Sequence, residues 1–295
     1  MMRWLTTVRH WGEMVKFSHS VFALPFALLA MFLAARPRTP TWTQCLLIVV
    51  CMVAARSAAM TFNRLVDARI DARNPRTARR QIPAGVIRPS AAWIAFALAC
   101  GVFVLGCAGF WTLLDNPWPL RLCAPVLLFL CFYSYTKRFT RLSHLFLGAG
   151  IALAPVAAWI AVRPETLGAP AWLLMAAVAF WIAGFDILYA CQDVDFDRAN
   201  RLHSLPARWG VGPALWAARG FHVVTVAALL GVGLSAGSGA LFFVGVGIVA
   251  ALLAVENAIV RPGDLSRVNL AFFTVNGIVG LALGALGIAD VMLAA

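Results

Sequence analysis

Charged side chains are scarce in this sequence. They make up 12% of the 295 residues, and hydrophobic residues make up 62%, whereas soluble domains contain about 25% charged and roughly 45–50% apolar residues. Acidic residues are the scarcest charged type, with 12 Asp and Glu against 24 Lys and Arg. This composition argues against a soluble fold and predicts a protein that is largely surrounded by lipid.

The sequence also lacks the usual spacing patterns of a metal or redox site. Its seven cysteines lie in or at the ends of apolar runs and never at the close CxxC spacing, so we interpret them as small buried hydrophobic residues. Apart from His203 in a polar loop, the histidines are too scattered to form a metal-binding set. We therefore assign them no role.

Apolar runs of about 20 residues recur along the chain instead. Each is long enough to cross a hydrocarbon core about 30 Å thick as an α-helix. No long segment is left over for a separate soluble domain, so residues 1–295 are predicted to form a single all-α transmembrane domain. The nine predicted spans are residues 15–36, 41–63, 89–113, 117–135, 142–163, 169–192, 212–235, 237–256 and 268–292.

Basic residues are concentrated on one side of these spans. If the N-terminus is cytoplasmic, 15 of the 24 Lys and Arg fall in loops on that side, while the opposite loops hold Arg36, Arg38 and Arg163. This bias follows the positive-inside rule, and it explains the net charge of +12 without a nucleic-acid partner. We therefore expect a cytoplasmic N-terminus and an external C-terminus. The cytoplasmic loops are those around residues 64–88, 136–141, 193–211 and 257–267.

Five of the twelve acids occur in two short segments where predicted spans end at the cytoplasmic side. Asp67 and Asp71 stand four residues apart in the first segment, as do Asp193 and Asp197 in the second. On a helix such a pair shares one face and repels itself, and the C-terminal end of the helix dipole also disfavours anions. The arrangement therefore calls for a cation, and paired carboxylates suit Mg²⁺.

A salt-bridged helix end is the alternative interpretation of each acidic pair. Asp71 has no basic residue among its three- and four-residue neighbours, which weakens this alternative for the first pair. The two segments also correspond to one another, since aligning their acids places Asn63 over Tyr189. An internal duplication with two acidic pairs facing one cavity would hold metal ions on either side of a diphosphate.

Arginines follow the first acidic pair directly. Arg79 and Arg80 lie in a loop that ends in Pro83-Ala84-Gly85. Guanidinium groups bind phosphate oxygens in a bidentate manner, so both residues are candidates for binding substrate. The alternative is that they only orient the chain in the bilayer.

Taken together, these motifs resemble the UbiA superfamily of membrane prenyltransferases. The resemblance covers essentially the whole chain and rests on an ordered set of motifs: Asn63-xxx-Asp67-xxx-Asp71, the Arg-rich tail that follows, Tyr133-Ser134-Tyr135-Thr136-Lys137, and Asp193-xxx-Asp197. It implies a nine-helix bundle with a central cavity open to lipid, with both acidic motifs at the cytoplasmic side.

The resemblance also implies roles for individual residues. Asp67, Asp71, Asp193 and Asp197 would bind Mg²⁺ and, through it, an allylic diphosphate, with Asn63 in the same site. Tyr133 and Lys137 match the YxxxK motif, which is taken to contact the diphosphate or the reacting centre, and Tyr189 belongs to the second motif. The chain departs from the family at Arg64, where many members carry Asp.

The implied reaction is the transfer of a polyprenyl group to an aromatic acid in quinone biosynthesis. The second motif and the residues after it resemble 4-hydroxybenzoate polyprenyltransferases, and also relatives that prenylate a dihydroxynaphthoate for menaquinone. The implied partners are polyprenyl diphosphate, the aromatic acid and membrane lipid, in the inner membrane of a bacterium. The alternative is a secondary transporter, but transporter sites lie near the bilayer midplane on broken helices, whereas these acids fall at helix ends.

Two charged residues lie deeper within the predicted spans. Arg56 precedes Asn63 by seven residues, and Asp186 precedes Asp193 by seven. Charges at such depth usually face the interior of a bundle and either pair or bind substrate. The two residues are therefore predicted either to form an ion pair or to bind substrate, with Arg56 receiving the carboxylate of an aromatic acid.

The predicted orientation can be tested by labelling single cysteines in a cysteine-free background. A cysteine in place of Ala78 or Ala199 should react with a membrane-impermeant maleimide only from the cytoplasmic side, because both positions lie in Arg-rich loops. A cysteine in place of Gly237 should react only from outside. The reverse labelling pattern would refute the orientation.

Overall fold

The computed structural model describes residues 9–15 and 20–294, and nearly all regular structure in these ranges is helical. Each of the nine predicted spans coincides with a helix, although residues 16–19 of the first lie outside the described residues. Within these described residues, eight helices are long and apolar enough to cross a membrane, and the apolar part of α2, Phe22–Ala35, is shorter. The all-α membrane fold predicted from hydropathy is thus confirmed.

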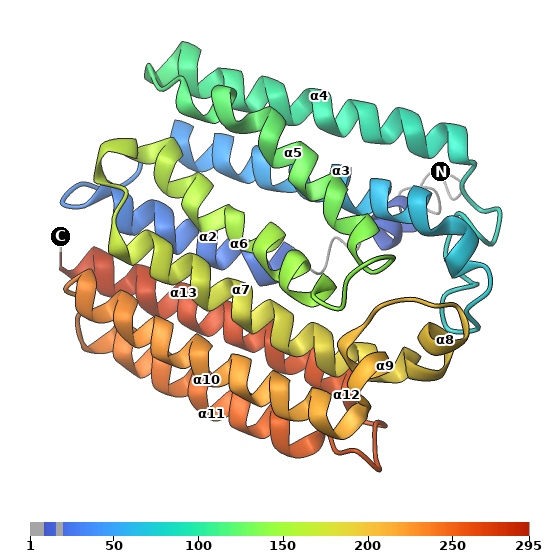
Figure 1. Ribbon diagram of the computed structural model, residues 1–295. Helices are drawn as coiled ribbons and strands as arrows, with labels where there is room; N and C mark the ends of the chain where they lie inside the picture. The colour runs from blue at the N-terminus through green and yellow to red at the C-terminus, as the bar shows by residue number, and fades with distance from the viewer. Residues whose placement is uncertain (1–8, 16–19, 295) are drawn as a thin grey trace. The chain divides into compact units, whose positions relative to one another are not determined.

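The helices are labelled in Figure 1. The long ones are α2 (Ser20–Ala35), α3 (Trp42–Asp71), α4 (Pro89–Leu114), α5 (Trp118–Thr136), α6 (Ser143–Val162), α7 (Ala169–Ala190), α10 (Val211–Ser235), α11 (Ala240–Ile259) and α13 (Asn276–Leu293). The shorter ones are η2 (Pro164–Thr166), η3 (Cys191–Asp193), α8 (Val194–Ala199), α9 (Leu205–Trp209), α12 (Val268–Leu270) and the π-helical η4 (Ala271–Val275).

The contacts divide the chain into two compact units. The first consists of Met1–Ser20 and Leu46–Tyr135, and the second of Val21–Cys45 and Thr136–Ala295. The first acidic motif therefore belongs to the first unit, and the second motif to the second unit. Lys137 falls two residues beyond Tyr135, in the second unit.

In the first unit, α3, α4 and α5 pack through small side chains. Ala54, Phe103, Cys107 and Cys123 form a buried cluster drawn from all three helices. α4 approaches α3 closely at Gly106, where an added methyl group would lie 2.7 Å from the Cys51 sulfur. Small residues permit such close approach between membrane helices, where packing rather than a hydrophobic driving force holds them together.

The helix α3 is longer than the apolar run that predicted it. Its 30 residues span about 45 Å at 1.5 Å per residue, more than the hydrocarbon thickness of about 30 Å. The apolar run ends near residue 63, but no helix-breaking residue occurs before Asn74 and Pro75. The motif from Asn63 to Asp71 consequently occupies the last turns of a continuous helix that outlasts its apolar part.

In the second unit, α7 packs most extensively against α6 and α10 (Figure 1). Its interior face is fully buried along Leu174, Ile182 and Ile187. At Gly148, α6 approaches α7 so closely that a methyl group would overlap the Ala179 carbonyl oxygen. The two backbones are therefore in direct contact at this point.

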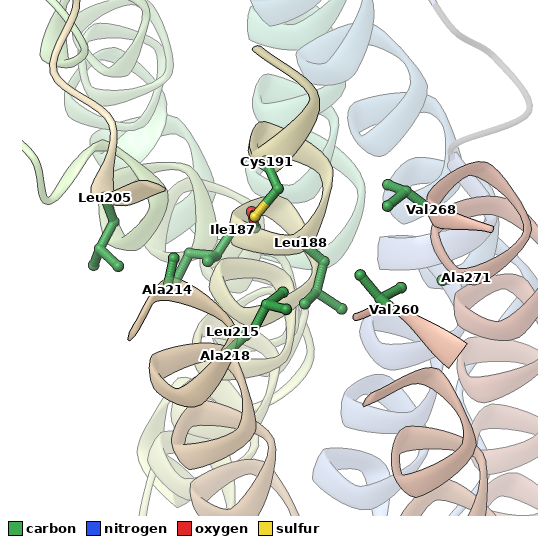
Figure 2. Packing of buried hydrophobic residues seen from close by; sticks show 10 residues of the cluster. All are labelled: Ile187, Leu188, Cys191, Leu205, Ala214, Leu215, Ala218, Val260, Val268 and Ala271. Carbon is green, nitrogen blue, oxygen red and sulfur yellow. The ribbon is translucent and has the colours of Figure 1, made fainter. Parts of the chain in front are cut away.

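A buried cluster closes one end of the second unit. Figure 2 shows Ile187, Leu188 and Cys191 at the end of α7, facing residues of α9, α10, α11 and the α12 region. Leu205, the first residue of α9, is 5% exposed and belongs to this cluster. The loop that follows the second acidic motif is thus anchored to the ends of the membrane helices.

Polar interactions close the opposite end of the second unit. Asp290 accepts hydrogen bonds from the backbone N–H groups of Gly239 at 2.7 Å and Phe242 at 3.4 Å, which places its carboxylate at the N-terminus of α11. Arg36 lies 3.8 Å from Asp290 and donates to the Ala236 carbonyl at 2.9 Å. An anion at a helix N-terminus is stabilised by the helix dipole.

The contact between α6 and α7 gives a stability prediction. Gly148→Ala should destabilise the protein by about 1–3 kcal/mol, as overpacked cores do, because the new methyl group overlaps backbone that cannot rotate away. Thermal unfolding in detergent would measure the loss. Gly247→Ala in α11 is the matched control, since an added methyl there meets nothing within 4 Å. Equal stability of the two variants would contradict the close packing.

Candidate functional site

The first acidic motif lies on one face of α3, as its spacing predicts. Asn63 Nδ2 donates to Asp67 Oδ2 at 3.2 Å. Asp67 is 1% exposed and Asp71, the last residue of the helix, is 3% exposed. Two carboxylates with so little contact with water require compensating positive charge.

A guanidinium from the following loop supplies part of that charge. Arg80 Nη1 lies 2.7 Å from Asp71 Oδ1 and 2.8 Å from Oδ2. The loop folds back because Thr77 Oγ1 donates to the Asp71 carbonyl at 3.0 Å and Asn74 Oδ1 accepts from the Arg76 N–H at 2.9 Å. Within the described part of the chain Arg79 is exposed and has no ion pair, so only Arg80 of the two predicted arginines contacts an acid.

Arg64 places a second positive charge beside the same acids. It is buried and lies close enough to Asp67, Asp71 and Tyr133 for electrostatic interaction. Arg64 stands where many family members carry Asp, and it is also the basic helical neighbour of Asp67 that the spacing predicts. Helical spacing contains the relevant signal, because Arg64 precedes Asp67 by three residues and Asp71 by seven and so shares their face.

Arg56 and Tyr133 lie in the same unit as this motif. Tyr133 is close enough to Arg56 to interact with it electrostatically, and it is also close enough to interact with Asp67. The Nε atom of Arg56 is buried and has no hydrogen-bond partner among the residues that the structure describes. The Arg56 guanidinium therefore has an N–H group that is available to donate a hydrogen bond.

The second acidic motif differs in backbone conformation from the first. Asp193 and Asp197 do not lie on one continuous α-helix, because α7 ends at Ala190, Cys191–Asp193 forms a 3₁₀ turn, and Asp197 lies on α8. Asp193 and Asp197 still interact electrostatically, and Asp195 is exposed. The turn ends at Asp193 and places Asp197 on a separate short helix, which equal spacing in the sequence does not reveal.

Two polar groups accompany Asp197. The Ser204 hydroxyl and the Lys137 ammonium both lie close enough to the Asp197 carboxylate to stabilise its charge. The Lys137 carbonyl accepts the His203 N–H at 2.7 Å. The lysine of the predicted YxxxK motif is therefore next to the second acidic motif within the second unit.

A cavity of about 410 Å³ opens beside Asp197. It lies between the loop after α5 and the loop after α8, and its lining carries four guanidinium groups but one carboxylate, that of Asp197. A cavity with this charge favours an anion. The basic lining residues are Arg141, Arg198, Arg201 and Arg208.

Asp186 and Tyr189 both have partners within the second unit. Asp186 Oδ2 lies 2.7 Å from His144 Nδ1, so Asp186 is paired with a histidine to which the sequence analysis assigned no role. The Tyr189 ring packs on Phe272 with a centroid distance of 4.3 Å. The predicted alternatives for Asp186, a pair with Arg56 or a substrate contact, did not include this partner.

The donor groups of the acidic motifs fit a hard divalent cation. Among the described residues no three His, Cys, Asp or Glu side chains gather into one cluster. Each motif contributes two carboxylates, and Mg²⁺ in enzymes is commonly held by one or two carboxylates together with water and substrate phosphate. The motifs therefore suit a metal that arrives with, or is completed by, a phosphate ligand.

Comparisons with solved structures agree with the fold. A UbiA homolog from Aeropyrum pernix K1 is 32% identical, with a TM-score of 0.82 over 92% of this chain and 98% of that one. A UbiA homolog from Archaeoglobus fulgidus, bound to GPP and Mg²⁺, is 16% identical with a TM-score of 0.73 over 96% of this chain and 99% of that one. The second likeness concerns the fold alone.

Comparisons of sequence identify the family. A 4-hydroxybenzoate octaprenyltransferase from Vibrio vulnificus (strain CMCP6) is 30% identical over 262 residues, which cover 88% of each chain. Residues 23–278 match the UbiA prenyltransferase family. The resemblance seen in the motifs is thus confirmed, and this multi-pass membrane protein belongs to the UbiA prenyltransferase family.

Proposed function

We propose that this enzyme transfers a polyprenyl group from an allylic diphosphate to an aromatic acid in an Mg²⁺-dependent reaction of quinone biosynthesis. The bond between the prenyl carbon and the diphosphate oxygen breaks. A carbon–carbon bond forms to the ring position ortho to a phenolic hydroxyl, and that ring carbon loses its proton. We take residues 1–295 to act as a single functional domain.

The observation that carries this proposal is the pairing of carboxylates with cationic side chains in both acidic motifs. Asp71 is bound by Arg80, and Asp197 lies beside Lys137. Carboxylates hold a divalent cation, while Arg and Lys bind phosphate oxygens directly. Both kinds of group are needed to stabilise the charge that develops on a departing diphosphate.

In the first motif, Asp67 and Asp71 would hold Mg²⁺, with Asn63 orienting Asp67 through their hydrogen bond. Mg²⁺ supplies a fixed positive charge on the diphosphate oxygens. Arg80 would then have a second role, because a guanidinium that no longer pairs with Asp71 would bind phosphate oxygens in a bidentate manner. Arg64 adds a positive charge that stays buried beside both acids.

In the second motif, Asp193 and Asp197 would hold Mg²⁺ in the same way, and Lys137 would contact the diphosphate. The arginine-lined cavity beside Asp197 supports this assignment, since it admits a phosphate group next to the carboxylate. Tyr133, Tyr189 and Arg79 remain candidates for contacts with substrate.

The membrane location suits the two parts of the prenyl substrate. A long prenyl chain partitions into lipid, while its diphosphate stays at an aqueous boundary. Arginine-rich loops mark the cytoplasmic side by the positive-inside rule. We therefore place the reaction at the cytoplasmic face of a bacterial inner membrane, with a cytoplasmic N-terminus.

The proposed acceptors are 4-hydroxybenzoate and, as the second candidate, a dihydroxynaphthoate of the menaquinone pathway. The similarity to a 4-hydroxybenzoate octaprenyltransferase over 88% of both chains favours the first. A transporter is disfavoured because Asp71 is the last residue of α3 and thus lies at a helix end, whereas coupling-ion sites lie near the bilayer midplane.

An assay of the purified protein tests the proposal. With Mg²⁺, geranyl diphosphate and 4-hydroxybenzoate, it should release diphosphate and form the prenylated acid, whereas dihydroxynaphthoate in the same assay separates the two acceptors. Ala in place of Asp67, Asp71, Asp193 or Asp197 should abolish turnover while leaving folded protein in the membrane, because each change removes a metal ligand.

Asp195→Ala is the matched control for these four variants, because Asp195 lies between two of the acids yet is exposed. It should retain turnover. Near-normal activity in two of the four acidic variants would reject the metal assignment.

Arg56 provides a test of how the acceptor is recognised. Seven residues place it about 10 Å deeper along α3 than Asn63, and its buried Nε lacks a partner. An entering carboxylate must leave water, at a cost that a guanidinium offsets through paired hydrogen bonds. Arg56→Lys should therefore weaken the apparent affinity for the aromatic acid about tenfold, or ~1.4 kcal/mol, and leave that for the prenyl diphosphate unchanged.

Measuring both apparent affinities separately decides the role of Arg56. Arg121→Lys is the control, since Arg121 also lies within a span but stacks on Trp118 at the far end of α5. An unchanged affinity for the aromatic acid in folded Arg56→Lys protein would exclude Arg56 as the carboxylate anchor. An equal loss of apparent affinity for both substrates would indicate that Arg56 has a structural role instead.

A further inference from the structure

His144 connects three segments of the second unit. It lies on α6 and is 4% exposed. Its Nδ1 atom is 2.7 Å from Asp186 Oδ2 on α7, and its Nε2 atom is 3.3 Å from the backbone nitrogen of Leu205, which begins α9. Both ring nitrogens of a buried imidazole are thus engaged, one with a membrane helix and the other with a loop.

These partners define the tautomer of His144. A backbone N–H can only donate, so Nε2 accepts the hydrogen bond from Leu205 and carries no proton. The proton is then on Nδ1, which donates to the Asp186 carboxylate. An imidazole with both nitrogens fixed in this way cannot rotate without losing two buried hydrogen bonds, which makes it a rigid link.

The hydrogen bond between Leu205 and His144 connects His144 to the second acidic motif. Ser204 precedes Leu205 and is buried, and its hydroxyl accepts the Ala207 N–H at 3.3 Å and lies beside the Asp197 carboxylate. Leu205 is held by the buried cluster in Figure 2. The position of Asp197 therefore depends on Ser204, whose backbone is fixed through Leu205 by His144.

His203, which precedes Ser204, is also held in place. The His203 N–H donates to the Lys137 carbonyl at 2.7 Å, and the Ser143 hydroxyl donates to the His203 carbonyl at 3.3 Å. His203 and Leu205, on either side of Ser204, are thus both attached to the segment that contains Lys137, Ser143 and His144. This attachment connects the segment of Lys137 to the loop that carries Ser204, and it thereby sets the spacing between the Lys137 ammonium and the Asp197 carboxylate.

We propose that His144, oriented by Asp186, is a positioning residue that holds Ser204 and thereby Asp197 in the geometry that binds Mg²⁺ and diphosphate. It touches neither metal nor substrate in this role. The inference rests on the proposed function, in which Asp197 is a metal ligand. It also assigns Asp186 to the orientation of His144 rather than to substrate binding.

The first experiment measures the loop directly and requires no activity. Limited trypsin digestion, followed by mass spectrometry, compares cleavage after Arg198, Arg201 and Arg208 with cleavage after Arg76 and Arg79 in the same molecule. In His144→Leu, cleavage in the second loop should accelerate about tenfold while the first loop is unchanged. Equal acceleration in both loops, or none in the second, would overturn the proposal.

The second experiment measures how the same change affects catalysis. His144→Leu should raise the Mg²⁺ concentration for half-maximal turnover about tenfold and leave the KM for the aromatic acid unchanged. His144→Gln should restore most of the Mg²⁺ dependence, because its amide nitrogen can donate to Asp186 while its oxygen accepts from Leu205. A variant that loses affinity for both substrates alike, or a Gln variant as impaired as Leu, would refute a positioning role.

His222→Leu is the matched control for loss of a buried histidine. His222 is 3% exposed on α10 and pairs with Asn257, away from the acidic loop. It should leave both the Mg²⁺ dependence and the cleavage of the second loop unchanged, and an equal effect in His222→Leu would reject the assignment. If wild-type protein shows no Mg²⁺-dependent turnover, the proposed function fails, and the digestion still decides whether His144 holds the loop.

Discussion

The cost of placing a carboxylate at the edge of a membrane is the constraint on which this structure depends. An uncompensated buried charge costs several kcal/mol, and the buried or half-buried acids Asp71, Asp186 and Asp290 each have a specific partner. Asp71 is bound by Arg80, Asp186 by His144, and Asp290 by two backbone N–H groups and Arg36. These pairs also fix the loops and helix ends from which they come. The contacts that compensate the buried charges are therefore the same contacts that hold these parts of the fold together.

Hydropathy predicts the spans well because a membrane helix must satisfy its backbone internally, which leaves length and apolarity as its main requirements. It predicts helix ends poorly. The apolar run of α3 stops near residue 63, but the backbone stays helical to Asp71 because nothing before Asn74 breaks it. At the second motif the reverse occurs, and a 3₁₀ turn at Asp193 interrupts a segment whose spacing alone predicts one helix.

The contacts in the candidate site are likewise of two kinds: some join residues close in sequence and others join distant residues. The hydrogen bond between Asn63 and Asp67 spans four residues of one helix, and periodicity predicts that they meet. The same periodicity predicts Arg64 beside Asp67, three residues away, and the structure places it there. His144 could not be assigned from the sequence, because its partners Asp186 and Leu205 lie 42 and 61 residues away and meet it only through the packing of α6 on α7.

The two acidic motifs hold their carboxylates in place by different structural means. In the first, a continuous helix fixes both carboxylates, and the compensating charge is a guanidinium from a loop that folds back on the helix end. In the second, the long helix α7 ends at Ala190, before either acid, so it does not hold Asp197, which lies on the six-residue helix α8. A hydroxyl from Ser204 and the chain of contacts through Leu205 to α6 take over that role. A duplicated sequence pattern therefore does not imply a duplicated means of support: where the helix ends early, tertiary hydrogen bonds must supply the rigidity that the helix supplies in the other motif.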